Sequence, residues 1–206
     1  MKIICFDTET TGLIPRPKPM IFAKDKWPYI LQLSYIIYDT DSKNYIFEND
    51  YIKLEDYSVI TEESYNIHKI DKIYLQQNGK NIKEVLLKFN TYLKDSQIVL
   101  GHNLQFDKDM IIIECYRNKV FHYFNNNMLK IQEYCTMKQG INICKIEKTN
   151  SAGEIYYKWP KLKELYLELF KEEPHESLLH NAFYDVYYTL KCYFKIEYDE
   201  ILNLKF

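Results

Sequence analysis

The first fifty residues carry short apolar runs separated by polar or proline-rich segments, the pattern of β-strands and loops. Residues 3–6 are all apolar, and an acid follows at once. Residues 29–38 and 45–54 form two further apolar or alternating runs, and the polar residues 39–44 between them predict a β-hairpin. Before the hairpin, residues 14–28 predict a loop, because four prolines interrupt regular structure there. These prolines are Pro15, Pro17, Pro19 and Pro28.

The rest of the chain shows the spacing of amphipathic helices, interrupted by short strands. The pattern predicts helices beginning near Thr61 and after Trp159-Pro160, further helices over 81–93, 106–117 and 179–198, and strands over 98–101 and 129–137. On the helix over 106–117, the expected buried face is Phe106, Met110, Ile113 and Tyr116. The chain shows no repeat, linker or low-complexity tract, so residues 1–206 are expected to form one domain. Strands and helices mix without strict alternation, which favours an α/β fold with a mixed sheet flanked by helices.

Composition narrows the class of protein. With 206 residues and 47% hydrophobic residues, the chain can bury one sizeable core. The formal net charge of −2 excludes a globally basic nucleic-acid binder but leaves room for a local basic surface. No apolar run approaches the roughly 18 residues of a membrane-spanning helix, and no signal peptide precedes the first strand, so no membrane association is expected.

Residue usage also indicates where the protein works. The five cysteines are widely spaced without a CxxC pair, which favours a reducing intracellular compartment, cytoplasm or nucleus, over a disulfide or zinc framework. The chain has 20 tyrosines and many lysines, whereas Arg16 and Arg117 are its only arginines. This bias suggests an AT-rich genome, viruses included.

Asp7 and Glu9 stand two residues apart directly behind the first strand. Residues two apart on a strand point to the same face, so both carboxylates can converge on one point. A divalent metal with a preference for oxygen ligands, Mg²⁺ or Mn²⁺, would relieve their repulsion. Taken alone, the pair fits two solvated acids at a strand end equally well.

Two later segments place further candidate groups at helix starts. In GHNLQFDKDM, Asp107 falls in the first turn of the helix over 106–117, where an acid also complements the helix dipole. In HNAFYDVYYTLKCYF, His180 and Asp185 open a strongly apolar helix. Asp185 lies at the edge of the buried side, which is costly for an acid without a partner.

Together, the three segments resemble the DEDD superfamily of 3′–5′ exonucleases. The resemblance rests on Asp-x-Glu behind a strand, Asn-x-x-Phe-Asp opening a helix, and His-x-x-x-x-Asp opening a late helix. It is similar to the branch with a histidine base, which includes the proofreading subunit of bacterial DNA polymerase III. The branch with a tyrosine base would carry Tyr at Asn181. The similarity extends to TTGL, IHKI, LGHNLQFD and WPKLKELYLELF, and Lys69 departs from it where many relatives have Gly.

The resemblance implies an RNase H-like fold and a site for two Mg²⁺ or Mn²⁺ ions. Asp7 would contact both ions, Glu9 and Asp185 would complete one, and Asp107 would support the other. His180 would act as the general base. The implied substrate contacts are Thr8, Thr10 and Thr11 at the terminal nucleotide, Leu13 and Phe106 against bases, and His68 and Asn103 nearby. For Leu13 and Phe106, core packing is an equal alternative. Lysines 108, 158, 161 and 163 are either upstream phosphate contacts or simply solvated.

The function implied is a metal-dependent 3′–5′ exonuclease that acts on single-stranded or frayed DNA and releases nucleoside 5′-monophosphates. An exoribonuclease remains the alternative, since a flexible single-stranded 3′ end with a 2′-OH could also fit. A non-catalytic nucleic-acid-binding module and a small-molecule phosphoesterase are the other readings. The expected partner is a single-stranded 3′ end, DNA in preference to RNA, and the sequence does not identify a polymerase or other replication partner.

Overall fold

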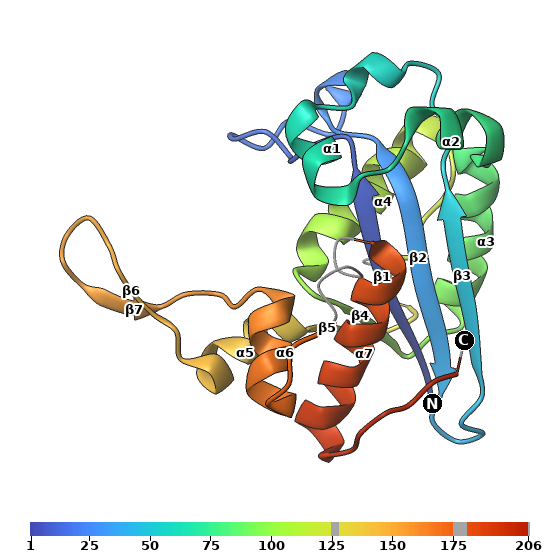
Figure 1. Cartoon of the computed structure of the whole chain (residues 1–206). Coiled ribbons are helices and arrows are strands. Elements are labelled where there is room, and N and C mark those ends of the chain that lie inside the picture. The colour runs from blue at the N-terminus through green and yellow to red at the C-terminus, as the bar shows by residue number, and fades with distance from the viewer. Residues whose placement is uncertain (125–127, 175–180, 206) are drawn as a thin grey trace.

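A five-stranded sheet forms the centre of the protein (Figure 1). The computed structural model describes residues 1–124, 128–174 and 181–205. The strand order is β3-β2-β1-β4-β5, with β1 antiparallel to β2 and parallel to β4. The expected mixed sheet is therefore confirmed. The strands are β1 (Lys2–Thr10), β2 (Ile30–Asp39), β3 (Tyr45–Tyr51), β4 (Ile98–Gly101) and β5 (Gln132–Cys135).

Helices cover both faces of the sheet. Figure 1 shows α3 (Ile82–Lys94) and α4 (Leu104–Asn118) behind the sheet and α7 (Ala182–Tyr198) in front of it. Successive side chains of β1 point to opposite faces of the sheet. Ile4 and Phe6 pack into the core with α3 and α4, whereas Ile3 and Cys5 pack against α7. The remaining helices are α1 (Glu62–His68), α2 (Lys72–Asn78), α5 (Thr136–Cys144) and α6 (Leu162–Phe170).

The predicted hairpin and the helix start at Thr61 are confirmed; α7 begins at Ala182, and its expected start at 179 lies outside the described residues. The hairpin is β2 and β3, paired from Gln32↔Tyr51 to Tyr38↔Tyr45. The Thr61 hydroxyl caps α1 by accepting a hydrogen bond from the Ser64 backbone N–H at 3.1 Å. The prolines do lie in a loop, which contains only a short 3₁₀ turn, Lys24–Lys26.

Two local predictions are wrong. The strand expected over 129–137 is limited to β5, because its partner β4 has four residues and pairs only with Gln132–Cys135; α5 begins at the next residue. Tyr116 is 48% exposed and does not share the buried face of α4. Each three-residue step falls about 60° short of a full helical turn, so two such steps after Met110 rotate Tyr116 out of the core.

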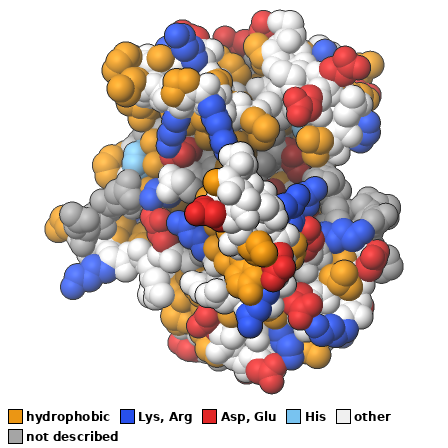
Figure 2. Space-filling model, turned by 90° about the vertical axis from the view of Figure 1, so that its left-hand side faces the viewer, with side chains coloured by type: hydrophobic (Ala, Val, Ile, Leu, Met, Phe, Trp, Pro, Cys, Tyr) orange, Lys and Arg blue, Asp and Glu red, His pale blue; other side chains and the backbone are white. Residues whose placement is uncertain are grey.

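A small antiparallel hairpin, β6 (Glu147–Thr149) and β7 (Ile155–Tyr157), projects from the body of the protein (Figure 1). It was not predicted, because its exposed residues lack a buried face and so a hydrophobic period. Figure 2 views the molecule from this side and shows acidic and basic side chains interspersed. Among the described helices, none combines the length and apolar character needed to cross a membrane.

Candidate active site

The side of the sheet that faces α7 changes from apolar to polar at the same level in three adjacent strands. Cys5, Ile36 and Phe47 lie side by side across β1, β2 and β3. Two residues further along, Asp7 pairs with Ser34 and Ser34 with Asn49; at the next level, Glu9 pairs with Gln32 and Gln32 with Tyr51. Directly paired residues project to the same face. A polar surface therefore follows the apolar one, and the first turn of α7 lies at this end of the sheet.

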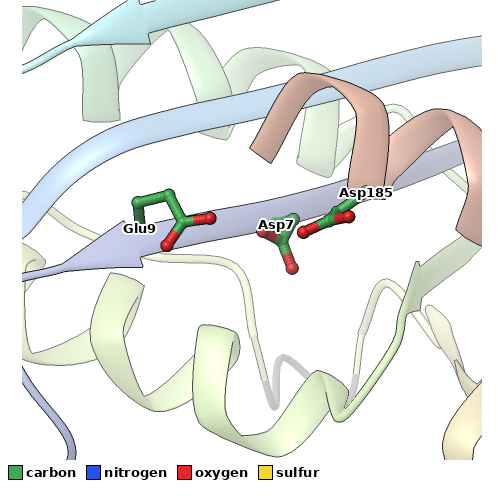
Figure 3. Close-up of side chains that lie close together, drawn as sticks. All are labelled: Asp7, Glu9 and Asp185. Atoms are coloured by element: carbon green, nitrogen blue, oxygen red, sulfur yellow. The ribbon is translucent and has the colours of Figure 1, made fainter. Parts of the chain in front are cut away.

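Three carboxylates converge on this surface (Figure 3). Asp7 and Glu9 come from β1, and Asp185 comes from the first turn of α7. One oxygen of each lies within 4.8 Å of one oxygen of each of the others. The backbone N–H of Asp185 donates to the Asn181 carbonyl at 3.1 Å, so the helix itself positions this acid. The convergence expected for Asp7 and Glu9 is observed, and the late helix adds Asp185.

Asp107 reaches the same region from the opposite face of the sheet. It is 3% exposed and lies in the first turn of α4. Its Oδ1 accepts hydrogen bonds from the Thr8 N–H at 3.0 Å and the Thr8 hydroxyl at 2.7 Å. Asp107 therefore stands outside the group of three but is tied to the residue between Asp7 and Glu9.

The electrostatics of the four acids favour a bound cation. Burial, followed by repulsion from Asp107, Asp185 and Glu9, raises the pKa of Asp7 well above its usual range. Burial and the same neighbouring aspartates raise the pKa of Glu9 to about 9. For Asp107, burial raises the pKa to about 7 although the Thr8 hydrogen bonds oppose the rise. Neither Asp7 nor Glu9 forms an ion pair with a lysine or arginine of the described residues.

The donor set fits a hard divalent cation. Clustered carboxylate oxygens are the ligands that Mg²⁺ and Mn²⁺ take in proteins. A cation among them would offset the burial and the mutual repulsion that raise the pKa values of Asp7, Glu9 and Asp107. Asp7, Glu9 and Asp185 could hold it directly, and Asp107 lies near enough to interact electrostatically with Asp7.

The threonine loop behind the acids is built by its own hydroxyls. The Thr10 hydroxyl donates to the Gly12 carbonyl at 2.7 Å, and the Thr11 hydroxyl accepts from the Tyr29 N–H at 3.0 Å. With the Thr8 hydroxyl on Asp107, all three are engaged within the chain and all three residues are buried. Leu13, by contrast, is 75% exposed at the end of the loop, so the core-packing alternative for Leu13 is wrong.

His68, another predicted substrate contact, lies inside the fold. His68 is buried at the end of α1; its Nδ1 accepts from the Ile70 N–H at 2.9 Å, and its Nε2 has no hydrogen-bond partner within the described chain. Burial, with Lys69 beside it, lowers the pKa of His68 to about 4. Lys69 ends α1 in the left-handed conformation, with φ 55°, a backbone conformation that favours glycine.

Asn103 and Phe106 flank the start of α4. Asn103 is exposed, has φ 65°, and makes no capping hydrogen bond with its side chain. Phe106 is partly buried and packs against the core between the sheet and α4. The predicted base, His180, lies outside the described residues.

Two polar residues with structural hydrogen bonds were not singled out from the sequence. His102, directly after β4, connects to α5 and to the loop before α6: its Nδ1 lies 3.0 Å from the Thr136 hydroxyl and its Nε2 lies 3.1 Å from the Pro160 carbonyl oxygen. Gln32, fully buried beside Glu9, is the second. A polar residue inside an apolar strand was the available signal for Gln32.

Three of the four candidate phosphate-binding lysines form ion pairs within the protein. Lys108 pairs with Glu133 at 2.5 Å, and Lys158 pairs with Glu164 at 2.5 Å. Lys163 pairs with Glu173 at 3.4 Å. These three lysines therefore stabilise the fold through ion pairs, whether or not they also contact phosphates.

Comparisons with known proteins show which family and which solved structures this chain is similar to. The RNase_T family model, described as exonuclease, matches residues 4–193. No curated protein matches the sequence significantly. Among solved structures, E. coli exonuclease I with a dA16 oligonucleotide gives a TM-score of 0.65 at 19% identity, covering 96% of this chain and 41% of that one. Its zinc-bound complex with single-stranded DNA gives a TM-score of 0.67 at 20% identity, with 96% and 41% covered. The chain thus spans about two fifths of the length of these exonucleases and shares the fold of that part.

Proposed function

We propose, on the premise that the chain belongs to the RNase_T exonuclease family, that it is a metal-dependent 3′–5′ exonuclease releasing nucleoside 5′-monophosphates. Membership of this family confirms the resemblance to the DEDD superfamily and, with the shared architecture, the RNase H-like fold. The histidine branch, the polarity of cleavage and the number of metal ions belong to the proposal. The observation that carries it is the convergence of Asp7, Glu9 and Asp185 from two elements far apart in the sequence.

Each acid has a role that its position supports. Asp7, Glu9 and Asp185 would hold two Mg²⁺ or Mn²⁺ ions, with Asp107 completing the set from α4. Bound divalent ions neutralise charge on the scissile phosphate and lower the pKa of water. His180, five residues before Asp185, would take the proton of the attacking water, as a histidine with a pKa near 6.5 can at neutral pH.

The loop from Thr8 to Leu13 would bind the terminal nucleotide. The hydroxyls of Thr8 and Thr10 donate to Asp107 and the Gly12 carbonyl, and the Thr8 and Thr11 backbone N–H groups donate to Asp107 and Tyr29, so the loop has a fixed shape against which the nucleotide would bind. Leu13 is exposed and free to lie against a base, with Phe106, His68 and Asn103 completing the pocket for the 3′ end. This arrangement favours a nucleic-acid end over a small phosphoester.

DNA is the proposed substrate in preference to RNA. Support comes from the exonuclease I structures that share this fold, which were determined with dA16 and dT13 oligonucleotides. An exoribonuclease is the alternative, because a flexible single-stranded 3′ end that carries a 2′-OH could also fit the site. A non-catalytic binding module is disfavoured, because degenerate members would lack an acid and all four are present.

The test uses DNA and RNA oligonucleotides labelled at the 5′ or the 3′ end, with Mg²⁺ or EDTA. We expect mononucleotides from the 3′ end with Mg²⁺, faster from DNA than from RNA. Single strands, matched duplexes and 3′ mismatches in parallel define the preferred end. Pure protein that leaves every substrate intact with Mg²⁺ and with Mn²⁺ would refute the proposal, and faster RNA degradation would favour the alternative.

A further inference from the structure

Gln32 lies between the strand that carries Glu9 and the helix that carries Asp185. Its side chain is fully buried. It is paired with Glu9 in the β1–β2 ladder, so both side chains project from the same face of the sheet. A buried amide at this position requires hydrogen-bond partners, and these partners reveal its role.

Both ends of the Gln32 amide bind the N-terminus of α7. Its Oε1 accepts from the backbone N–H of Ala182 at 3.3 Å, and its Nε2 donates to the Asn181 side-chain oxygen at 3.1 Å. Asn181 is the residue that caps α7, since the same oxygen accepts from the Phe183 N–H at 3.1 Å. Gln32 thus holds the cap and the first N–H of the helix together.

Asp185 lies one helical turn after Asn181, the capping residue of α7 that Gln32 binds. Its N–H and that of Tyr184 donate to the Asn181 carbonyl, at 3.1 and 2.9 Å. Within one hydrogen-bonded turn, the backbone of Asp185 cannot move independently of Asn181. The distance from Asp185 to Asp7 and Glu9 is therefore set where α7 meets β2.

Strand β3 holds the Gln32 side chain from the side opposite α7. The second N–H of the Gln32 amide donates to the Asn49 side-chain oxygen at 2.8 Å, and the Ser34 hydroxyl donates to the same oxygen at 2.7 Å. Gln32 thus uses both donors on side-chain carbonyl oxygens and its acceptor on a backbone N–H. A glutamate here would present oxygen to both carbonyl oxygens and add a fifth acid, fully buried, beside Glu9.

We propose that Gln32 is a positioning residue that fixes the first turn of α7 and thereby sets the spacing of Asp185 from Asp7 and Glu9, on which divalent-ion binding depends. This inference rests on the proposed metal-dependent function. Groups that orient metal ligands from behind commonly change metal affinity by about 10- to 100-fold when removed. Gln32 does so through the helix cap rather than by contact with a ligand.

The test compares Gln32→Met with Ser34→Ala. Met keeps the length and bulk of the side chain but removes all three hydrogen bonds, whereas Ser34→Ala removes a bond to Asn49 and none to α7. Mn²⁺ titration by calorimetry, without nucleic acid, should show weaker binding in Gln32→Met by about 10- to 100-fold and a change below about threefold in Ser34→Ala. In oligonucleotide cleavage, raising Mn²⁺ should restore much of the activity that Gln32→Met loses.

Asn181→Ser provides a second variant in case Gln32→Met does not fold. Serine still caps the helix, yet it lacks the carbonyl oxygen that Gln32 binds, so Mn²⁺ affinity should again fall while the helix content is kept. A folded Gln32→Met or Asn181→Ser variant with wild-type Mn²⁺ affinity overturns the inference. Wild-type protein that binds Mn²⁺ but cleaves no oligonucleotide overturns the proposed function instead and leaves the role of Gln32 measurable.

Discussion

Thr8 donates both its backbone N–H and its hydroxyl to the same carboxylate oxygen of Asp107, at 3.0 and 2.7 Å. The central strand and the start of α4 are thereby joined at the level of the acid cluster. Because Thr8 stands between Asp7 and Glu9, this pair fixes the fourth acid relative to the other three.

Replacing Thr8 by Val should shift the pH dependence of activity. The hydroxyl lowers the Asp107 pKa, which stands at about 7, so its loss should raise that pKa further. Asp107 must be ionised to attract a cation, and the acidic limb of kcat/KM against pH should therefore move up by as much as about one unit. Thr8→Ser, which keeps the hydroxyl, is the control. An unmoved acidic limb in Thr8→Val would exclude Asp107 as the group that titrates there.

Asp7→Ala should abolish cleavage and leave the fold intact. Asp7 is the acid whose charge is opposed by all three others, so its removal relieves repulsion while it removes the central ligand. Activity should fall by more than about 100-fold, beyond the loss typical of a group behind the ligands. Mononucleotide release measures activity, and thermal melting in EDTA should show equal or greater stability. Near-normal turnover would mean that the site lies elsewhere.

His180→Ala should reduce kcat by about 10² to 10⁴, the contribution of a general base, without weakening Mn²⁺ binding. The separation of these two effects distinguishes a base from a ligand. Calorimetry and cleavage at saturating Mn²⁺ measure them independently. Equal losses in both would instead assign His180 to metal binding.

The stability of the metal-free protein should fall as the pH rises. The pKa values of Glu9, about 9, and Asp107, about 7, exceed their ordinary values of 4.5 and 3.8. Between its ordinary pKa and its raised pKa, each acid holds a proton in the folded protein but not in the unfolded chain. Its contribution to stability is therefore complete below about pH 4, and it is lost as the pH rises to 7 for Asp107 and to 9 for Glu9. Melting in EDTA from pH 5 to 9 should show the decline, on the order of 5 °C or more, and Mg²⁺ should remove it. Glu9→Gln should flatten the curve, and a steady rise in wild-type stability would contradict the proposed cause.

Arg117→Lys should destabilise the proline-rich loop. The Arg117 guanidinium lies 3.8 Å from the ring centre of Tyr29, pairs with buried Glu114 at 2.7 Å, and donates to the Pro28, Trp27 and Lys24 carbonyls. Lysine cannot reproduce this planar set of donors. The free energy of unfolding in urea should fall by about 2–4 kcal/mol, whereas exposed Arg16→Lys, the matched control, should stay within about 0.5 kcal/mol. Equal effects at both positions would show that Arg117 is not specifically required.

The sequence was sufficient for features that depend on local pattern. The hairpin β2–β3, the cap at Thr61 and the shared face of Asp7 and Glu9 follow from periods of two residues or from single-residue chemistry. The long apolar stretch of α7 likewise predicted its buried side, with Val186 and Leu190 fully buried.

Features that depend on pairing between distant segments were not predictable in this way. The length of β5 follows from the length of β4, and the exposure of Leu13 from how the threonine loop closes on Tyr29. The polar Gln32 stands out within an apolar strand, but its role depends on its hydrogen bonds to Asn181 and Ala182 at the start of α7, which no local period encodes.

The acid cluster joins Asp7, at the first polar level of the central strand, to Asp185 in the last long helix. An ion held there would cross-link residues 7 and 185 and so close a loop that contains most of the protein. In the unfolded state such a closure costs substantial configurational entropy, which the folded state has already met. Ion binding should therefore slow global opening as well as enable chemistry, and the protein would be most resistant to proteolysis when it is ready to act.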